Sequence, residues 1–299
     1  MSSTRRDWLK GAMRTGLAAG IVGGAGHALA QEGASEAQRR ADEDEAARKA
    51  AKKVEKPELP YALKKGKPKK ALFVYGGWPG HQPEQNRDIF VPFLKKSGFE
   101  VVVSDKQDVY ADEKLMESLD LIVQIWTMGT IKGEHLKGLT HAVNKRGVGL
   151  AGWHGGLGDA YRQEVEYQWM VGGQWVSHPG GIVPYRVHVT ETEDPITEGL
   201  TDFDLKTEQY YMHVDPNNKV LATTRFTGEH SASTTDAVMP VVWKKLYGRG
   251  RVFYTSMGHN VDVWDTPAAL TIMKRGMLWA SRSRFETTPS LISPVYPTR

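Results

Sequence analysis

One short stretch, residues 148–156 (VGLAGWHGG), constrains what this chain can fold into more than any other. An apolar run breaks into glycines around one polar side chain, which predicts a buried strand ending in a sharp strand-to-helix turn. The pattern Gly152-x-His154-x-Gly156 has the form of a nucleophile elbow, whose glycines permit backbone angles and close approaches that larger residues forbid. Such a turn lifts a side chain above the carboxyl edge of a sheet, where open α/β sheets bind ligands. The raised residue is His154, a good base or metal ligand.

The region before this turn alternates short apolar runs with amphipathic segments. The apolar runs predict buried strands, and the segments with helical spacing, such as the one opened by Pro83, predict helices. This alternation predicts an α/β fold with a mostly parallel sheet and helices on both faces. The predicted strands cover 71–75, 99–103, 121–125 and 148–151, and the predicted helices cover 83–97, 113–119 and 132–145.

The region after the turn is less regular. A helix over 165–170 and a final helix over 267–280, opened by Pro267, follow from the apolar spacing. Further strands, some of them antiparallel, are predicted over 185–190, 219–223, 239–244 and 251–256.

The N-terminal residues are predicted to lie outside the fold. Arg5-Arg6, a glycine-rich apolar run and Ala28-Leu29-Ala30 follow one another in the order of a twin-arginine (Tat) export signal. As a membrane anchor the apolar run is too short and too rich in glycine. A charged, proline-containing stretch comes next, with little that could bury a core. The predicted organisation is an export signal (1–30), a linker (31–70), a folded domain (71–283) and a C-terminal tail (284–299).

Charge and cysteine content exclude several functions. The signal carries four basic residues against one acidic residue, or +3 of the formal +4, so the remaining chain is close to neutral. A nucleic-acid interface is therefore not supported, and no integral membrane span is expected once the signal is removed. Without cysteine there is no disulfide, thiolate metal site or cysteine nucleophile, so any metal must be held by His and carboxylates.

Five ionisable residues share one local context, the end of a predicted strand or a glycine-marked loop. They are His81, His154, His178, Glu208 and His259. Because loops after parallel strands meet at one edge of a sheet, His81 and His154 are predicted to converge, whereas topology says less about the other three. Four of the remaining histidines are interpreted as structural or exposed, and His213 stays ambiguous. These four are His135, His141, His188 and His230.

Several aromatic residues recur at the same loops. Each of them singly is more typical of core or rim packing, but aromatics around polar groups also suit a sugar ring, whose C–H face stacks on them. The residues considered as substrate-binding on this ground are Trp78, Trp126, Trp153, Trp175 and Tyr210.

Taken together, the motifs resemble those of the trehalose-utilisation (ThuA-like) family. The resemblance rests on segments that follow one another in order across nearly all of residues 71–282. They are Gly-Gly-x-x-Gly-His at 76–81, Gly-Trp-His-Gly-Gly at 152–156, Gly-Gly-x-x-x-Ser-His-Pro at 172–179, Asp-Pro-Ile-Thr-Glu-Gly-Leu at 194–200, Glu208-x-Tyr210 and Gly-Arg-Val-Phe-Tyr-Thr-Ser-Met-Gly-His at 250–259.

The resemblance implies a fold and an activity. The fold is the flavodoxin-like three-layer sandwich of class I glutamine amidotransferase-like proteins, with His154 in place of the elbow cysteine, so amidotransferase chemistry is excluded by residue type. The activity implied is the processing of 3-keto-glycosides, with a divalent metal such as zinc. Asp194-Pro195 departs from the more usual His-Pro of the family, in a loop interpreted as structural.

The hypothesis is a periplasmic, metal-assisted enzyme that cleaves 3-keto-glycosides by elimination and hydrolysis. The predicted metal ligands are His154, His178 and His259, with His154 and at least one of the other two binding the ion. The predicted catalytic residues are Glu208, His81 and His154, and Glu208 is either a further ligand or the general base. The partner is a small carbohydrate, and homo-oligomerisation is left open. Two alternatives remain: a non-catalytic carbohydrate-binding or scaffolding module, and a metal-dependent hydrolase of another ester or amide.

Overall fold

A nine-stranded sheet forms the centre of the computed structural model, which describes residues 69–286. The strands lie in the order β2-β1-β3-β4-β11-β10-β9-β6-β7. The predicted export signal and almost all of the predicted linker fall outside the described residues, as does most of the tail. Those three assignments therefore stay predictions.

Five neighbouring strands of the sheet pair in parallel, as the alternation of strands and helices predicts. Three strands of this group, β3, β4 and β11, are almost wholly buried, and the carboxyl ends of all five lie at one edge of the sheet. This parallel half consists of β1 (Lys69–Gly77), β2 (Phe99–Ser104), β3 (Leu121–Thr127), β4 (Gly149–Trp153) and β11 (Gly250–Thr255).

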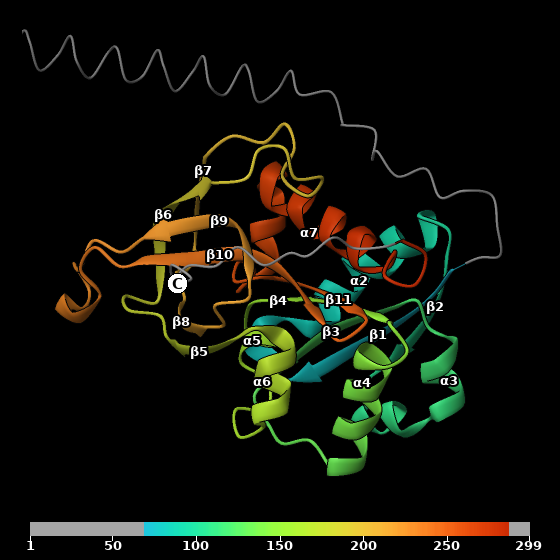
Figure 1. Cartoon of the computed structure of the whole chain (residues 1–299). Coiled ribbons are helices and arrows are strands. Elements are labelled where there is room, and N and C mark those ends of the chain that lie inside the picture. Colours follow the sequence, from blue (N-terminus) through green and yellow to red (C-terminus); the bar gives the residue numbers. More distant parts are fainter. Residues whose placement is uncertain (1–68, 287–299) are drawn as a thin grey trace, which may run out of the picture. The chain divides into compact units, whose positions relative to one another are not determined.

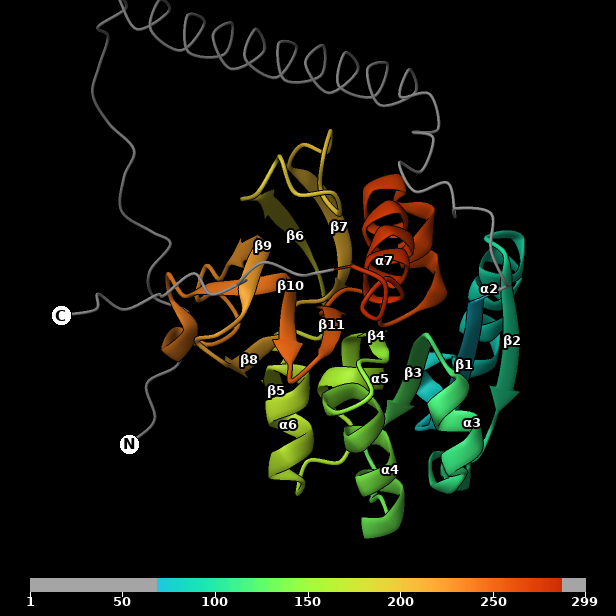
Figure 2. The same cartoon turned by 45° about the vertical axis from the view of Figure 1, so that its right-hand side comes forward.

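Helices cover both faces of the parallel half (Figures 1 and 2). Successive strand residues face opposite ways, so Phe73 and Val123 pack in the core beneath α2 and α7, while Leu72 and Ile122 pack beneath α3, α4 and α6. The predicted three-layer α/β sandwich is therefore confirmed. The helices are α2 (Pro83–Lys96), α3 (Glu113–Ser118), α4 (Gly133–Asn144), α5 (His154–Gly158), α6 (Val165–Val171) and α7 (Pro267–Ala280).

The other half of the sheet is antiparallel and extends it beyond β11. Register shifts between β9 and β10 mark irregular pairing, which bends and twists a sheet locally. The extension consists of β6 (Ile182–Val189), β7 (Phe203–Glu208), β9 (Lys219–Arg225) and β10 (Val238–Tyr247). A separate two-stranded sheet pairs β5 (Gly173–Ser177) with β8 (Tyr211–Val214).

The predicted elbow is present between β4 and α5. His154 has φ +47°, in the left-handed region that few residues other than glycine adopt. A Cβ on Gly156 would lie 2.8 Å from the backbone Cα of Ile125, so glycine is required where α5 crosses the end of β3. The elbow thus needs both a strained histidine and a close backbone contact.

Gly138 offers a test of how closely α4 packs. In a helix interior, alanine normally stabilises relative to glycine by about 1 kcal/mol. A Cβ at position 138, however, would lie 1.9 Å from the carbonyl oxygen of Tyr110, in the 3-10 helix η2 (Gln107–Ala111). We expect Gly138→Ala to lower the free energy of unfolding by about 1–3 kcal/mol in urea titrations.

Gly133, in the first turn of the same helix, is the matched control because nothing lies within 4 Å of a Cβ there. Gly133→Ala should leave the free energy of unfolding unchanged or raise it by up to about 1 kcal/mol. Equal effects of the two substitutions would contradict the steric explanation.

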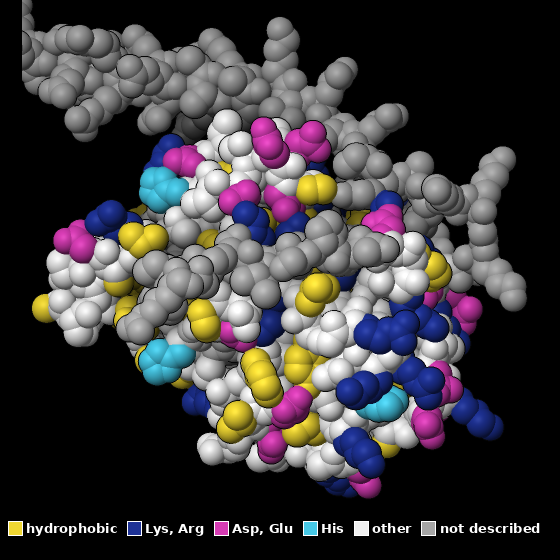
Figure 3. Space-filling view, viewed as in Figure 1, with side chains coloured by type: hydrophobic (Ala, Val, Ile, Leu, Met, Phe, Trp, Pro, Cys, Tyr) yellow, Lys and Arg dark blue, Asp and Glu magenta, His cyan; other side chains and the backbone are white. Residues whose placement is uncertain are grey.

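No helix of residues 69–286 is long and apolar enough to cross a bilayer. On the surface shown in Figure 3, Lys and Arg side chains gather over the region where Figure 1 has α3 and α4, with acidic side chains among them.

Candidate metal centre

Four buried side chains meet at the carboxyl edge of the parallel strands. They are His81, His154, Glu208 and His259, and one possible ligand atom from each lies within 4.8 Å of all the others. His81 ends the 3-10 helix η1 (Pro79–His81) after β1, His154 follows β4, and His259 follows β11. Glu208 is the last residue of β7. This group, here called the His₃Glu cluster, is the one such set among residues 69–286.

The tautomer of His154 is set by the backbone. Its Nδ1 lies 2.7 Å from the carbonyl oxygen of Ser256, which can only accept, so Nδ1 carries the proton. Its Nε2 faces Oε2 of Glu208 at 3.0 Å. Burial lowers the pKa of His154, although the carboxylate of Glu208 and the carbonyl of Ser256 act to raise it, so the neutral ring is favoured. A lone pair then points at a carboxylate, an arrangement that needs a cation or proton between the two atoms.

His81 is neutral as well. Burial, with smaller contributions from the neighbouring His154 and His259, lowers its pKa to about 2. Its Nδ1 lies 2.7 Å from Oγ1 of Thr127, at the end of β3. The hydroxyl can accept from Nδ1–H, which leaves Nε2 of His81 to serve as a ligand. The hydroxyl of Thr127 thus fixes the ring from the strand beside β1.

Glu208 is the anion of the cluster. Burial alone would raise its pKa, but the imidazole nitrogens of His154 and His259, 3.0 and 3.1 Å from its Oε2, together hold the pKa well below its ordinary value. Its Oε2 also lies 3.1 Å from Nδ1 of His259. Three imidazoles around one ionised carboxylate form the donor set that zinc and similar ions prefer in cysteine-free sites.

A buried nitrogen without a hydrogen-bond partner also indicates that the cluster suits a metal ion. Nδ1 of His259 is buried without a well-aligned hydrogen bond, although it lies close to Glu208. A buried polar atom without a partner costs free energy, so such atoms in native proteins commonly indicate a missing ion or water. The residues present therefore fit a divalent cation, as the sequence predicts, although the ion itself remains a prediction.

His178 lies at the rim of the cluster. Its Nε2 is 3.7 Å from Oε1 of Glu208, and 37% of its side chain is exposed, whereas His154 and Glu208 are buried. It is not one of the four clustered residues, although it is predicted above as a ligand. His81 is clustered in its place. Residue types and spacing alone could not show which of these two histidines belongs to the cluster, because the position of His178 depends on how the chain turns after β5.

Aromatic side chains line the cluster on several sides. Tyr210 stacks on His154 with ring centroids 3.9 Å apart and planes at 27°. Trp78 and His81 form an edge-to-face pair with ring centroids 4.8 Å apart. Trp78 is 42% exposed, so part of the indole ring is open to a ligand. Trp175 lies 5.6 Å from His178 and also contacts Tyr210. Trp78 and Tyr210 thus lie beside the cluster, and Trp175 lies beside His178 at its rim.

Trp153 corrects one prediction. It is fully buried and packs against Phe73, Phe90 and Trp264 in the core beneath α2 and α7. Because successive strand residues face opposite ways, the residue before His154 points into the core and offers no surface to a sugar. Trp126 packs over Gly76 and against the core beneath α3, α4 and α6, which is on the face of the sheet opposite to the core that contains Trp153. Its part in substrate binding stays a prediction.

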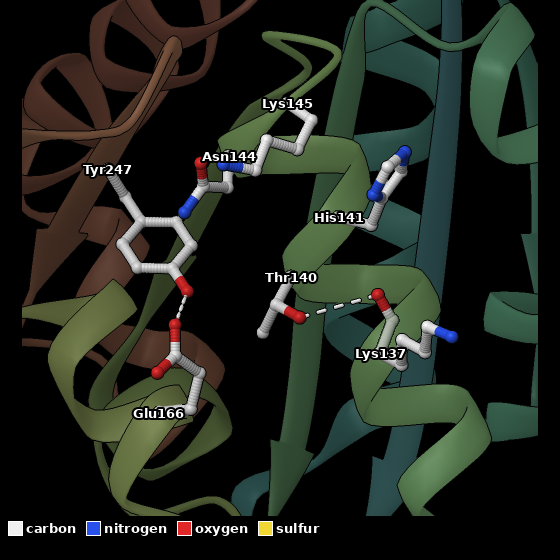
Figure 4. Close-up of a pocket in the computed structure, with 7 residues that line it drawn as sticks. All are labelled: Lys137, Thr140, His141, Asn144, Lys145, Glu166 and Tyr247. Carbon is white, nitrogen blue, oxygen red and sulfur yellow. Dashed lines mark hydrogen bonds between the residues drawn. The ribbon is translucent and has the colours of Figure 1, made fainter.

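A pocket of about 190 Å³ lies elsewhere, beside α4. In Figure 4 the hydroxyl of Tyr247 donates to Glu166 on one side, opposite side chains from α4. No function is predicted above for these residues. The lining residues are Lys137, Thr140, His141, Asn144, Lys145, Glu166 and Tyr247.

Comparisons with known proteins agree with this fold. A ThuA-like protein from Bacteroides uniformis ATCC 8492 matches with a TM-score of 0.62 and 18% identity, over 74% of this chain and 94% of that chain. A ThuA-like protein from Parabacteroides merdae ATCC 43184 matches with a TM-score of 0.59 and 18% identity, over 75% and 94%.

No curated protein matches the chain. The family described as trehalose utilisation (ThuA) matches residues 70–280, which is well over half of the sequence and includes all members of the His₃Glu cluster. The chain therefore belongs to the ThuA-like family of trehalose-utilisation proteins.

Proposed function

We propose that the chain is a metal-assisted enzyme that cleaves 3-keto-glycosides by elimination followed by addition of water. The observation that carries the proposal is the His₃Glu cluster, in which Nε2 of His154 and Oε2 of Glu208 face each other at 3.0 Å. Membership of a trehalose-utilisation family makes a carbohydrate the natural substrate class.

Within the cluster, His81, His154 and His259 would hold a divalent cation together with Glu208. When bound, such an ion supplies Lewis-acid polarisation of a carbonyl oxygen. The protein orients the imidazoles through their other nitrogen, as the Ser256 carbonyl does for His154. The ketone of the substrate is the group that benefits, because polarisation makes the hydrogen on the adjacent carbon acidic.

His178 is the proposed general base. Its imidazole is partly exposed, lies next to Glu208 and is not among the clustered ligands. It takes the proton from C2, the C1–O bond breaks, and a C1–C2 double bond forms. The same imidazole returns the proton to the departing oxygen, so an alcohol leaves. Water then adds across the double bond, and the net reaction is hydrolysis.

The aromatic residues are proposed to bind the sugar. Trp78 has an exposed ring beside His81 and His259, where the C–H face of a pyranose can stack. We also propose a periplasmic location, which the twin-arginine signal pattern of residues 1–30 supports.

The proposal is tested by metal content and activity together. After export, the protein should contain close to one divalent ion per chain by elemental mass spectrometry and should cleave 3-keto-glucosides. We expect His154→Ala to lose both properties. In contrast, His178→Ala should keep the metal and lose about 10²- to 10⁴-fold in kcat, as is typical when a general base is removed.

The outcomes separate the alternatives. Full activity of His178→Ala would exclude it as the base, and the absence of metal after supplying zinc, manganese and nickel would refute the proposal. If sugars bind saturably and the binding survives loss of the clustered histidines, the chain is a carbohydrate-binding module. The exposed ring of Trp78 would then be its platform.

A further inference from the structure

A single buried side-chain pair connects the segments that carry three of the four clustered residues. The pair is Asn86, in the first turns of α2, and Trp264, in the 3-10 helix η4 (Val261–Asp265). Nε1 of Trp264 donates to Oδ1 of Asn86 at 2.7 Å. Asn86 is 0% exposed and Trp264 is 5% exposed, so their hydrogen bond does not compete with water.

The amide of Asn86 holds the loop that ends in His81. Its Nδ2 donates to the carbonyl oxygen of His81 at 3.1 Å and to that of Gln82 at 3.0 Å. Gln82 has φ +52°, a conformation that costs free energy in a non-glycine residue and therefore needs support. Its side-chain Oε1 accepts from the backbone N–H of Val261 at 2.9 Å. Two hydrogen bonds thus join the His81 loop to η4.

The indole of Trp264 reaches the other two histidines through their neighbours. It contacts Trp153, the residue before His154, with ring centroids 5.7 Å apart. A Cβ on Gly258, the residue before His259, would lie 2.6 Å from Cδ1 of Trp153 and 3.0 Å from Cζ2 of Trp264. The backbone before His259 is therefore pressed against both indole rings, at a φ of +115° that favours glycine.

We infer that the Asn86–Trp264 pair positions His81, His154 and His259 relative to one another and so sets the affinity of the His₃Glu cluster for a metal ion. This inference rests on the metal binding of the proposed function. Neither residue touches the cluster's ligand atoms, so both are positioning residues. Outer partners that orient ligands commonly contribute about 10- to 100-fold to metal affinity.

Trp264→Phe tests the inference by removing the N–H donor while keeping an aromatic ring. The probe is Co²⁺ alone, titrated into metal-free protein, because its visible absorption reports both binding and ligand geometry. We expect Kd to rise about tenfold and the absorption bands to shift. Asn86→Ala is the second variant and should act in the same direction. The double variant should bind Co²⁺ no more weakly than the single variant with the higher Kd, since both substitutions remove one shared hydrogen bond.

Trp243→Phe is the matched control. Trp243 is fully buried in the other core, and its Nε1 donates to the carbonyl of Val171 at 3.0 Å. Trp243→Phe should lower Tm about as much as Trp264→Phe does and should leave the Kd for Co²⁺ unchanged. Equal Co²⁺ affinity and spectra in wild type and Trp264→Phe would overturn the inference while leaving the proposed function intact. If the wild type binds no Co²⁺, the proposed function fails and the inference fails with it.

Discussion

Glu208→Gln should abolish metal binding while leaving the fold intact. Glutamine has the shape of glutamate but removes the only anion of the His₃Glu cluster. We expect metal affinity to fall by at least about 100-fold, since even the loss of an outer partner costs about 10- to 100-fold. In the wild type, excess zinc should raise Tm, because an ion that binds only the folded state stabilises it. In the variant this rise should vanish.

The metal-free proteins give a second expectation. In the absence of an ion, the imidazoles of His154 and His259 still hold the pKa of Glu208 below its ordinary value. A carboxylate whose pKa is lower in the folded state than in the unfolded state stabilises the fold at neutral pH. Metal-free Glu208→Gln should therefore have a lower Tm than the metal-free wild type at pH 7. An unchanged or raised Tm would mean that burying the carboxylate costs more free energy than its contacts with the imidazoles return.

Glu166→Gln is the control for this experiment. Glu166 accepts a hydrogen bond from Tyr247 and lines the pocket shown in Figure 4, away from the cluster. The variant should bind zinc as the wild type does. Equal losses of metal in the two variants would point to a general effect of charge rather than to ligation.

The parallel half of the fold could be predicted because its signals are local. Buried parallel strands appear as short apolar runs, and Pro83 and Pro267 mark helix starts that the structure confirms. The elbow was predictable for the same reason, since a glycine pattern around His154 describes one turn of the backbone. Convergence of His81 and His154 then follows from the parallel order of β1, β3 and β4.

The rest of the cluster depends on long-range pairing that no local pattern contains. His259 reaches the site because β11, late in the chain, pairs in parallel with β4. Glu208 is harder still, because three strands separate β7 from β11 in the sheet order, yet its Oε2 lies 3.0 Å from Nε2 of His154. The antiparallel part of the sheet must curve to bring them together. β7 itself was missed, because FDLKTE has too few apolar residues to indicate a buried strand.

The supporting residues were missed for a related reason. Thr127 and Asn86 are common polar residue types, and only the fold shows their contacts with His81. Thr127 binds the imidazole of His81, and Asn86 donates to its backbone carbonyl. A polar residue at the carboxyl end of a strand, as Thr127 is, was the one signal available. Trp153 shows the converse error, since a loop context suggested a ligand contact for a residue that the strand directs into the core.

Asp194→Asn should produce the largest loss of stability among the substitutions considered. Asp194 forms an ion pair with Nζ of Lys244 on β10. Their side chains are only 8% and 7% exposed. Asparagine keeps the acceptor for the N–H of Ile196 but leaves the ammonium of Lys244 buried without its counter-ion. We expect the free energy of unfolding to fall by about 3–5 kcal/mol in urea titrations.

The reason for this cost can be tested by removing the other charge as well. A buried ion pair adds little net stability, whereas one unpaired buried charge is strongly destabilising. Adding Lys244→Met to Asp194→Asn should therefore restore most of the lost stability, with the methionine packing near the ring of Trp279 that the ammonium now faces at 5.0 Å. Asp236→Asn, which breaks an exposed pair with Arg225, should cost at most about 1 kcal/mol. If the double variant is no more stable than Asp194→Asn, Asp194 supports its loop through local hydrogen bonds instead of through the ion pair with Lys244.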